Sequence, residues 1–424
     1  MKKKLLFITG TLNIGGIETY IARLSKHLAD DLKVSVLILS KKGSKNLIDE
    51  VQKYADVYFL NDYVKIYGLS KINSSYFNVL IPIDYARLYS NIGDLDYIHA
   101  VDSLCNVVGL EFLKLNNNIR LTTGVYHSQE YLWKTNHYFR KVQRNLFLTF
   151  PNRNILNCNE KTINDLSLHL SKNFIGSPVI PIGIDIINYK NSNPSFRSNK
   201  IISIGRLVDF KTYNKHIIQE LDDINLDGYE LEYHIYGDGS EKEELQKIAM
   251  SKKSKIFFHG TIEYQDMPKV LNDAFVFIGS GTAIIEASAA GIPSIIGIES
   301  EDHPLTYGLF SNLSGYSYNE NDLDIPKIAI SELIIDLKRK SQNSYLDISN
   351  QHRNKAEEFS IFKSKNKFPI FLLEAKKLQF SYNRLHYKIS FFYWLLLNTL
   401  RIKDDKKTRY NKSVLCEENK WENQ

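Results

Sequence analysis

The chain has 424 residues, of which 43% are hydrophobic and 24% are charged. These proportions are those of a folded globular protein and exclude a largely disordered one, and the length favours two domains because one hydrophobic core seldom organises so many residues. The net charge of +6 comes from charges spread along the chain, so it permits an anionic ligand or a membrane surface and requires neither.

The first half of the chain alternates short apolar runs with helical patterns, which predicts βα units around a parallel sheet. The opening segment "MKKKLLFITG" is interpreted as a buried strand rather than a signal peptide, because its apolar run has only about five residues and no small-residue cleavage site follows. The expected strands are residues 4–9, 34–39, 57–60, 97–101, 120–125, 154–157 and 179–181. The expected helices are residues 17–29, 103–115, 138–150 and 161–170.

Residues 188–200, "NYKNSNPSFRSNK", are polar and have no usable period, so they are a linker candidate. A second series of elements follows. Its strands are expected at residues 200–204, 231–236, 255–259, 274–278 and 294–298, and its helices at residues 212–221, 242–251, 266–271 and 282–290. The chain is therefore expected to form two Rossmann-like domains, residues 1–187 and 188–377, followed by an extension, residues 378–424.

"TLNIGGIETYIARLSKHLA", residues 11–29, places Gly15 and Gly16 where the first strand gives way to a helix. Glycine weakens a helix by about 1 kcal/mol relative to alanine, so the pair indicates a need for bare backbone. Either a phosphate or sugar approaches the NH groups of the helix start, or a tight turn requires a positive φ.

The loop after the first strand of the second series carries two cations. Gly205 ends that strand, and Arg206 and Lys211 follow in "ISIGRLVDFKT". Ligand sites of parallel α/β sheets open at the carboxyl ends of strands, where a guanidinium and an ammonium can bind a diphosphate. The alternative is a solvated loop, because Lys and Arg are mostly exposed residues.

Two further strand ends in this half are rich in glycine. "IYGDGSEKEELQ" places Gly237 and Gly239 in what by itself is an ordinary turn. "AFVFIGSGTAIIEASAAGIPSII" leads through Gly279 and Gly281 into a helix that begins at Thr282. The free NH groups of such a helix start can face a phosphate.

Glu286 lies inside that helix among small residues, where a carboxylate has few protein partners. A buried carboxylate needs hydrogen-bond donors, and the two adjacent hydroxyls of a ribose would supply them. The alternative is an ordinary surface glutamate.

Taken together, these motifs resemble the nucleotide-sugar half of retaining GT-B glycosyltransferases, specifically family 4. The resemblance rests on the Gly-Arg-Leu-x3-Lys spacing, the Gly-Asp-Gly turn and "GSGTAIIEASAAGIPSI". In the first half, "NIGGIE" at residues 13–18 and "YHSQEYLW" at residues 126–133 are similar to the family's Gly-Gly and His-containing loops, and "PIGID" at residues 181–185 is similar to the segment that enters the interdomain linker. The resemblance spans residues 4–375 and implies two Rossmann-like domains whose parallel sheets face a central cleft.

The resemblance also implies residue roles. Arg206 and Lys211 would hold the donor diphosphate, Glu286 would hold the ribose, and His127 would face the donor sugar. A lone histidine is otherwise a structural residue in most proteins. The remaining residues implied to bind the donor are Gly15, Gly16, Gly205, Gly237, Gly239, Gly279, Gly281 and Thr282.

One position departs from the family pattern. The family has Glu-x7-Glu, whose first glutamate contacts the donor sugar, but Ile278 stands eight residues before Glu286. This puts sugar recognition at that corner in question.

The resulting hypothesis is a retaining, metal-independent glycosyltransferase of the hexosyl type that uses a nucleotide diphosphate sugar as its donor and needs no cofactor. The acceptor is a saccharide, with a lipid-linked saccharide of surface-polysaccharide assembly as one candidate, and no nucleic acid is expected to bind. Two alternatives stay open. A sugar-nucleotide epimerase with this architecture would need further acid/base carboxylates, and a non-catalytic sugar-nucleotide-binding protein is suggested by Ile278. A nicotinamide oxidoreductase is less favoured, because no Gly-x-Gly-x-x-Gly opens the first helix.

From about residue 378 the sequence becomes aromatic and basic, and two interpretations are open. A helix here either packs on the protein's own surface or lies in a bilayer interface. In the second case Phe391, Phe392, Tyr393 and Trp394 would be buried in the bilayer, and Lys388, Arg401 and Lys403 would reach the headgroups.

Cys105, Cys158 and Cys416 have no metal-ligand spacing and cannot all pair, so no zinc site and no disulfide framework is indicated. A cytoplasmic location is expected, with peripheral contact to the inner membrane face through residues 378–403 as an addition.

Overall fold

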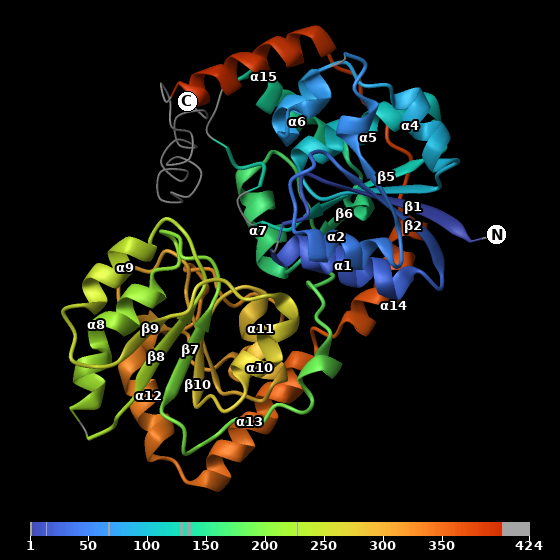
Figure 1. Ribbon diagram of the computed structural model, residues 1–424. Coiled ribbons are helices and arrows are strands. Elements are labelled where there is room, and N and C mark those ends of the chain that lie inside the picture. Colours follow the sequence, from blue (N-terminus) through green and yellow to red (C-terminus); the bar gives the residue numbers. More distant parts are fainter. Residues whose placement is uncertain are drawn as a thin grey trace. The chain divides into compact units, whose positions relative to one another are not determined.

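A computed structural model describes residues 2–13, 15–66, 68–127, 130–133, 137–226 and 228–400 (Figure 1). These residues form two compact units. The first contains the chain up to Ile182 and the described residues from Ser364 on, and the second is Gly183–Lys363. Each unit has a parallel sheet with helices around it, which confirms the expected pair of α/β domains.

The first unit is built on a six-stranded parallel sheet with the order β3-β2-β1-β4-β5-β6. Its central strand β1 pairs with β2 on one side and β4 on the other, so Leu5 lies opposite both Val34 and Tyr97. The apolar runs make such strands because both faces of a parallel sheet are covered by helices. The strands are β1 (Lys3–Thr9), β2 (Leu32–Ile38), β3 (Asp56–Phe59), β4 (Tyr97–Ala100), β5 (Arg120–Val125) and β6 (Ile155–Asn157).

Helices follow most strands of this unit, and several begin at a side-chain cap. Asp102 accepts from the NH of Cys105 at 2.7 Å to start α5, and such a cap contributes about 1 kcal/mol. The helices are α1 (Gly16–Leu28), α2 (Lys45–Gln52), α3 (Ser75–Leu80), α4 (Tyr85–Ile92), α5 (Ser103–Leu115), α6 (Tyr138–Thr149) and α7 (Glu160–His169). Short 3-10 helices are η1 (Leu60–Tyr63), η2 (Leu69–Lys71) and η3 (Asn152–Asn154).

Residues 179–181, expected as a strand, form only a single bridge, between Val179 and Asn157. Pro178 precedes this segment and Pro181 is its last residue, and a proline has no NH to donate to a sheet. The expectation of a full strand is wrong for that reason.

The second unit is built on a five-stranded parallel sheet with the order β11-β10-β7-β8-β9. The strands are β7 (Lys200–Ile204), β8 (Glu232–Tyr236), β9 (Ile256–Phe258), β10 (Val276–Gly279) and β11 (Ser294–Ile296), and β12 (Leu305–Thr306) pairs antiparallel with β13 (Ile328–Ala329). The helices are α8 (Tyr213–Asn225), α9 (Lys242–Ala249), α10 (Met267–Leu271), α11 (Thr282–Ala289), α12 (Ile330–Arg339) and α13 (Gln342–Glu357). The 3-10 helices are η4 (Ile186–Tyr189), η5 (Tyr264–Asp266) and η6 (Phe310–Asn312).

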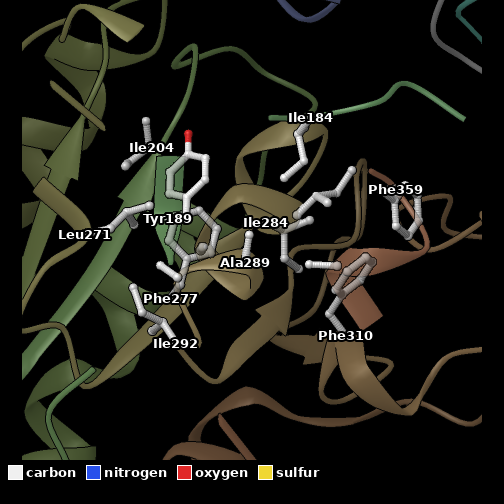
Figure 2. Packing of buried hydrophobic residues seen from close by; sticks show 14 of the residues in the cluster. Ile184, Tyr189, Ile204, Leu271, Phe277, Ile284, Ala289, Ile292, Phe310 and Phe359 are labelled. Atoms are coloured by element: carbon white, nitrogen blue, oxygen red, sulfur yellow. The ribbon is translucent and has the colours of Figure 1, made fainter. Parts of the chain in front are cut away.

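Two clusters of buried apolar side chains form the core of the second unit. One joins α11, η4 and η6 to strands β7 and β10, and Figure 2 shows Ile284 and Ala289 of α11 within it, together with Phe277 of β10. The other packs α8 and α12 against the sheet through residues such as Ile217 and Ile334. The two clusters hold the strand ends of this sheet in fixed positions.

The chain passes from one unit to the other at different places from those expected. Residues 188–200, the linker candidate, lie inside the second unit, where Ser195 donates to the Ala274 carbonyl at 3.0 Å and Arg353 donates to the Ser192 carbonyl at 2.8 Å. The divisions fall instead after Ile182 and Lys363, not at 187/188 and 377/378. A polar stretch without a period indicates an irregular loop, but it does not show whether that loop leaves its domain.

The chain returns to the first unit through α14 (Ile361–Glu374). Phe368 lies against the rings of Phe7 and His99, with centroids 5.7 and 5.1 Å apart. This contact with the central strands of the sheet explains why residues 364–377, expected in the second domain, belong to the first.

The last described helix is α15 (Arg384–Thr399), which packs on α6 (Figure 1) and also on α3 of the same unit. Phe391 stacks on Phe139 with ring centroids 4.6 Å apart, and Trp394 lies edge-on to Tyr76. The expectation that Phe391 and Trp394 enter a bilayer is therefore wrong, because the protein itself covers them. Phe392 and Tyr393 are 54% and 55% exposed, and Arg401 and Lys403 lie outside the described residues. None of the helices in the described part of the chain has both the length and the apolar character needed to cross a membrane.

Candidate functional site

The order of strands in the second unit defines where a ligand site is expected. The chain runs from β7 outward through β8 to β9 and then returns to place β10 on the other side of β7. Open α/β sheets bind ligands at the carboxyl ends of the strands that flank such a reversal. The loops at this point are residues 205–212, after β7, and residues 280–281, after β10. Of the predicted site residues, Gly205, Arg206, Lys211 and Gly281 lie in these two loops.

Arg206 and Lys211 both lie in the loop after β7. The Lys211 ammonium folds back over Gly205, so that a Cβ on Gly205 would stand 2.8 Å from Nζ. Arg206 is exposed, and within the described part of the chain neither cation has an acidic partner within 4.0 Å. Two uncompensated cations thus lie in one short loop at the reversal of the strand order, an arrangement that can bind an anion.

Gly237 and Gly239 have a packing role that the sequence did not indicate. Leu207 donates to the Asp238 carbonyl at 2.9 Å, and Gly205 donates to the Tyr236 carbonyl at 2.9 Å, so the loops after β7 and β8 lie backbone to backbone. A Cβ on Gly237 would clash with the carbonyl oxygen of Gly205, and a Cβ on Gly239 with that of Leu207. Close approach of these loops accounts for both glycines, and their contact with a donor stays a prediction.

The loop after β10 leads into α11 through Gly279, Ser280 and Gly281. Gly281 is the residue before the helix, with φ +65°, a conformation that glycine adopts without strain. Thr282 begins α11 and Glu286 follows one turn later. Glu286 is only 2% exposed, so the interpretation as a surface glutamate is wrong. Its contact with a ribose stays a prediction.

Ile278, at the position of the family's first glutamate, is completely buried within β10. It packs in the apolar cluster with Ile201 and Ile295 of the neighbouring strands. An acid there would be buried among apolar side chains at high energetic cost.

Glu299 is a residue of this edge that sequence reasoning missed. It follows β11, the neighbour of β10, and its Oε1 accepts from the Ser280 hydroxyl at 2.9 Å. The available signal was the acid-rich segment "GIESED" directly after a predicted strand.

In the first unit the strand order reverses between β1 and β4, and the predicted Gly15-Gly16 loop follows β1. Gly15 has φ −162°, which is extended backbone, and Gly16 is not among the described residues with positive φ. The alternative of a turn that requires positive φ is therefore wrong. The side chain of Glu18 lies beside Gly15, where a Cβ would clash with it.

His127 follows β5 and is half-buried, and its carbonyl accepts from the NH of Glu130 at 3.0 Å. The structure thus places it at the carboxyl edge of the first sheet, and its role toward a sugar stays a prediction. His99 in β4 is a different case: it is fully buried between Thr122 and Tyr126, and burial lowers its pKa to about 3.

The half-buried Asp102 and the buried Glu130 form a pair of acids that the sequence did not single out. Burial and the nearby Glu130 raise the pKa of Asp102 above its usual value. Both carboxylates accept from the first turn of α5, Asp102 from the Cys105 NH at 2.7 Å and Glu130 from the Ser103 NH at 3.3 Å. These bonds give the pair a structural function at a helix start.

Comparison with known proteins identifies the kind of fold. Residues 185–301 match the family described as Glycosyl transferases group 1, whereas no curated protein matches the sequence. Alr3699/HepE from Anabaena, solved with UDP and glucose, is 15% identical, with 88% of this chain and 99% of that chain covered and a TM-score of 0.62.

Two further solved structures are similar over both units. A mutant of S. aureus TarM, in complex with Fondaparinux, alpha-GlcNAc-glycerol and UDP, is 12% identical, with 87% and 99% of the chains covered and a TM-score of 0.61. Sucrose-phosphate synthase from Thermosynechococcus elongatus is 13% identical, with 88% and 99% covered and a TM-score of 0.61. At these identities the likeness establishes the fold, which is GT-B.

Proposed function

Because this chain carries a Glycosyl transferases group 1 domain on a GT-B fold, we propose that it is a glycosyltransferase that takes its sugar from a nucleotide diphosphate donor. The observation that carries this proposal is the position of Arg206 and Lys211. They lie in one loop at the strand reversal of the second sheet, without acidic partners among the residues described there. Their charge would stabilise the diphosphate as it leaves the sugar.

We further propose that transfer retains the configuration of the anomeric carbon and needs no metal ion. Retention is the expectation from the family resemblance. Metal independence is supported by the two cations, which can offset the charge of the leaving group that a metal would otherwise offset. In the first unit, Gly15, Gly16 and His127 remain predicted contacts of the donor, and each follows a strand at the carboxyl edge of its sheet.

Binding of nucleoside diphosphates tests the proposal most directly. Thermal shift with UDP, GDP and ADP should show stabilisation by one of them, because a ligand that binds only the folded state adds about 2.7 kcal/mol at 100 times its Kd. Arg206→Ala should weaken that ligand about tenfold or more, since charge-assisted hydrogen bonds are lost.

Arg197→Ala is the matched control, because Arg197 is an exposed arginine just before β7, at the opposite end of the strand. It should bind as the parent does. No shift with any diphosphate, or equal shifts in both variants, would refute the assignment. Once the donor is known, turnover in EDTA tests metal independence. The anomeric configuration of the product, read by NMR, tests retention. An epimerase would convert the donor without acceptor, and a non-catalytic protein would bind it without turnover.

We also propose that the acceptor is a saccharide carried by a lipid, and that α15 contacts an anionic membrane surface. The support is an apolar stripe on the side of α15 that faces away from α6. Its members are 45% to 70% exposed and recur at helical spacing: Leu385, Ile389, Phe392, Tyr393, Leu396 and Leu400. Residues 376–403 contain six Lys or Arg and no acid, which suits anionic headgroups.

Flotation with vesicles tests this contact. The full chain should float with phosphatidylglycerol-containing vesicles and less with pure phosphatidylcholine, and the double change Ile389→Gln and Phe392→Gln should abolish flotation. The control pair is Leu226→Gln and Met250→Gln, which removes two exposed apolar side chains from the second unit. Equal flotation of the two double variants would argue against membrane contact through the stripe. If the parent forms concentration-dependent dimers and the Ile389→Gln and Phe392→Gln variant does not, the partner of the stripe is a second copy of the chain.

A further inference from the structure

The carboxyl edge of the second sheet lacks an acid at the position where the family pattern has one. Ile278 occupies it, fully buried in β10 and packed among side chains of adjacent strands. A side chain at that position points into the core, so any acid that contacts the donor sugar must come from another element.

Glu299 brings a carboxylate to the same corner from the neighbouring strand. The NH of Gly297 donates to the Gly279 carbonyl at 2.8 Å, which joins the segment after β11 to the end of β10. The Ser280 hydroxyl donates to Glu299 Oε1 at 2.9 Å, and Ser280 is only 1% exposed. The Glu299 NH donates to the Asn319 carbonyl at 2.8 Å, so backbone and side chain are both held.

The segment that carries Glu299 also touches the loop with the two cations. The Ser300 NH donates to the Phe210 carbonyl at 2.7 Å, and Phe210 directly precedes Lys211. Tyr213, just after this loop, places its hydroxyl 3.5 Å from that of Ser280. The acid and the proposed diphosphate site therefore belong to one set of hydrogen-bonded loops.

A carboxylate in this place is suited to one part of the donor. It repels phosphates, but each of its oxygens accepts hydrogen bonds from hydroxyls. Glu299 is half-buried, and among the described residues its Oε2 has no hydrogen-bond partner. We infer that Glu299 binds hydroxyls of the donor sugar, replacing the acid absent at position 278, and that Ser280 positions it. This inference rests on the proposed function.

Paired binding measurements separate the contribution of the sugar to the affinity from that of the diphosphate. Calorimetric Kd values are compared for UDP and UDP-glucose, or for the corresponding pair of whichever diphosphate gives the thermal shift. Glu299→Gln should leave the Kd for the diphosphate within about twofold and raise that for the sugar nucleotide about tenfold, because hydrogen bonds to a charged group are lost. Ser280→Ala should raise the Kd for the sugar nucleotide less than Glu299→Gln does, and Glu299→Asp should keep part of the affinity that Glu299→Gln loses.

Glu301→Gln is the control for charge and loop integrity. Glu301 lies two residues further on and is paired with Lys327, so its loss removes the same charge without touching the inferred sugar contact. An unchanged ratio of the two Kd values in Glu299→Gln, or an equal change in Glu301→Gln, overturns the inference while the proposed function stands. Failure of the parent protein to bind any diphosphate removes the proposed function itself.

Discussion

The protonation state of a single side chain in this protein depends strongly on the polarity of its surroundings, and His352 is the clearest example. It is fully buried in α13, where Nε2 accepts from the Ser294 NH at 2.9 Å and Nδ1 lies 2.8 Å from the Ile348 carbonyl. This pattern requires a neutral ring with its proton on Nδ1. Burial lowers the pKa of His352 to about 4. Protonation would place a second NH against the Ser294 NH and remove that hydrogen bond between α13 and β11.

The depressed pKa predicts a pH dependence of stability. The unfolded ring titrates near pH 6.5, above the folded value of about 4, so the unfolded state binds the proton first as the pH falls. The stability that His352 contributes is complete above about pH 6.5 and is lost between there and about pH 4, at roughly 1.4 kcal/mol per pH unit.

Urea unfolding followed by far-UV circular dichroism checks this. From pH 7 to pH 5 the parent should lose about 2 kcal/mol more than His352→Gln does. Parallel curves for the two proteins would mean that His352 is not the group responsible. His99, whose burial also lowers its pKa, stays intact in both proteins and so cancels in the comparison.

At the scale of secondary structure, α15 has a buried side that packs on the first unit and an exposed apolar stripe for which we propose membrane contact. Tyr387, Phe391 and Trp394 face the first unit and are buried. Their spacing of four and three residues is that of a single helical face. Removal of the whole helix, for instance by ending the chain at Lys377, would therefore uncover Phe139 and Tyr76 and at the same time remove the exposed stripe. Substitutions in the stripe therefore test the proposed membrane contact without disturbing the packing of the buried side, and truncation does not.

Phe391 and Phe392 are adjacent in α15, and comparing their substitutions tests how the buried side of this helix packs on the first unit. Phe391→Ala should destabilise the first unit by about 3 kcal/mol or more, because a buried ring is replaced by a cavity. Phe392→Ala should change stability by less than about 0.5 kcal/mol, since that ring is 54% exposed. Trp133 and Trp394 both lie in the first unit, so tryptophan fluorescence during denaturant unfolding reports on it. Similar midpoints for the two variants would contradict the packing described for α15.

At the scale of the molecule, the chain leaves its first unit after Ile182 and comes back to it at Ser364. The return is held by aromatic contacts, since Phe368 and Phe371 of α14 pack on His99. The first unit is thus completed by a segment that joins it about 180 residues after Ile182. Its folding therefore has to bring together two segments that the whole second unit separates in sequence. The second unit is one continuous segment, Gly183–Lys363, and it contains Arg206, Lys211, Glu286 and Glu299, whereas Gly15, Gly16 and His127 belong to the first unit.

Local patterns in the sequence were enough for the order along the chain of the strands in both large parallel sheets and for helices α1 and α5 to α11, whereas α2, α3, α4, α12, α13 and α14 were not predicted. Apolar runs and helical periods predicted every strand of both large parallel sheets to within about two residues, because a strand buried on both faces must be apolar throughout. Gly205, Arg206 and Lys211 were also found from the local sequence, because they lie in the loop that follows such a strand. What tertiary structure decided was which loops meet. Glu299 reaches Ser280 only because β11 pairs with β10, and α14 belongs to the first unit only because its rings fit against Phe7 and His99. Contacts between distant segments depend on the pairing order of strands and on complementary packing, and neither leaves a mark in the local sequence.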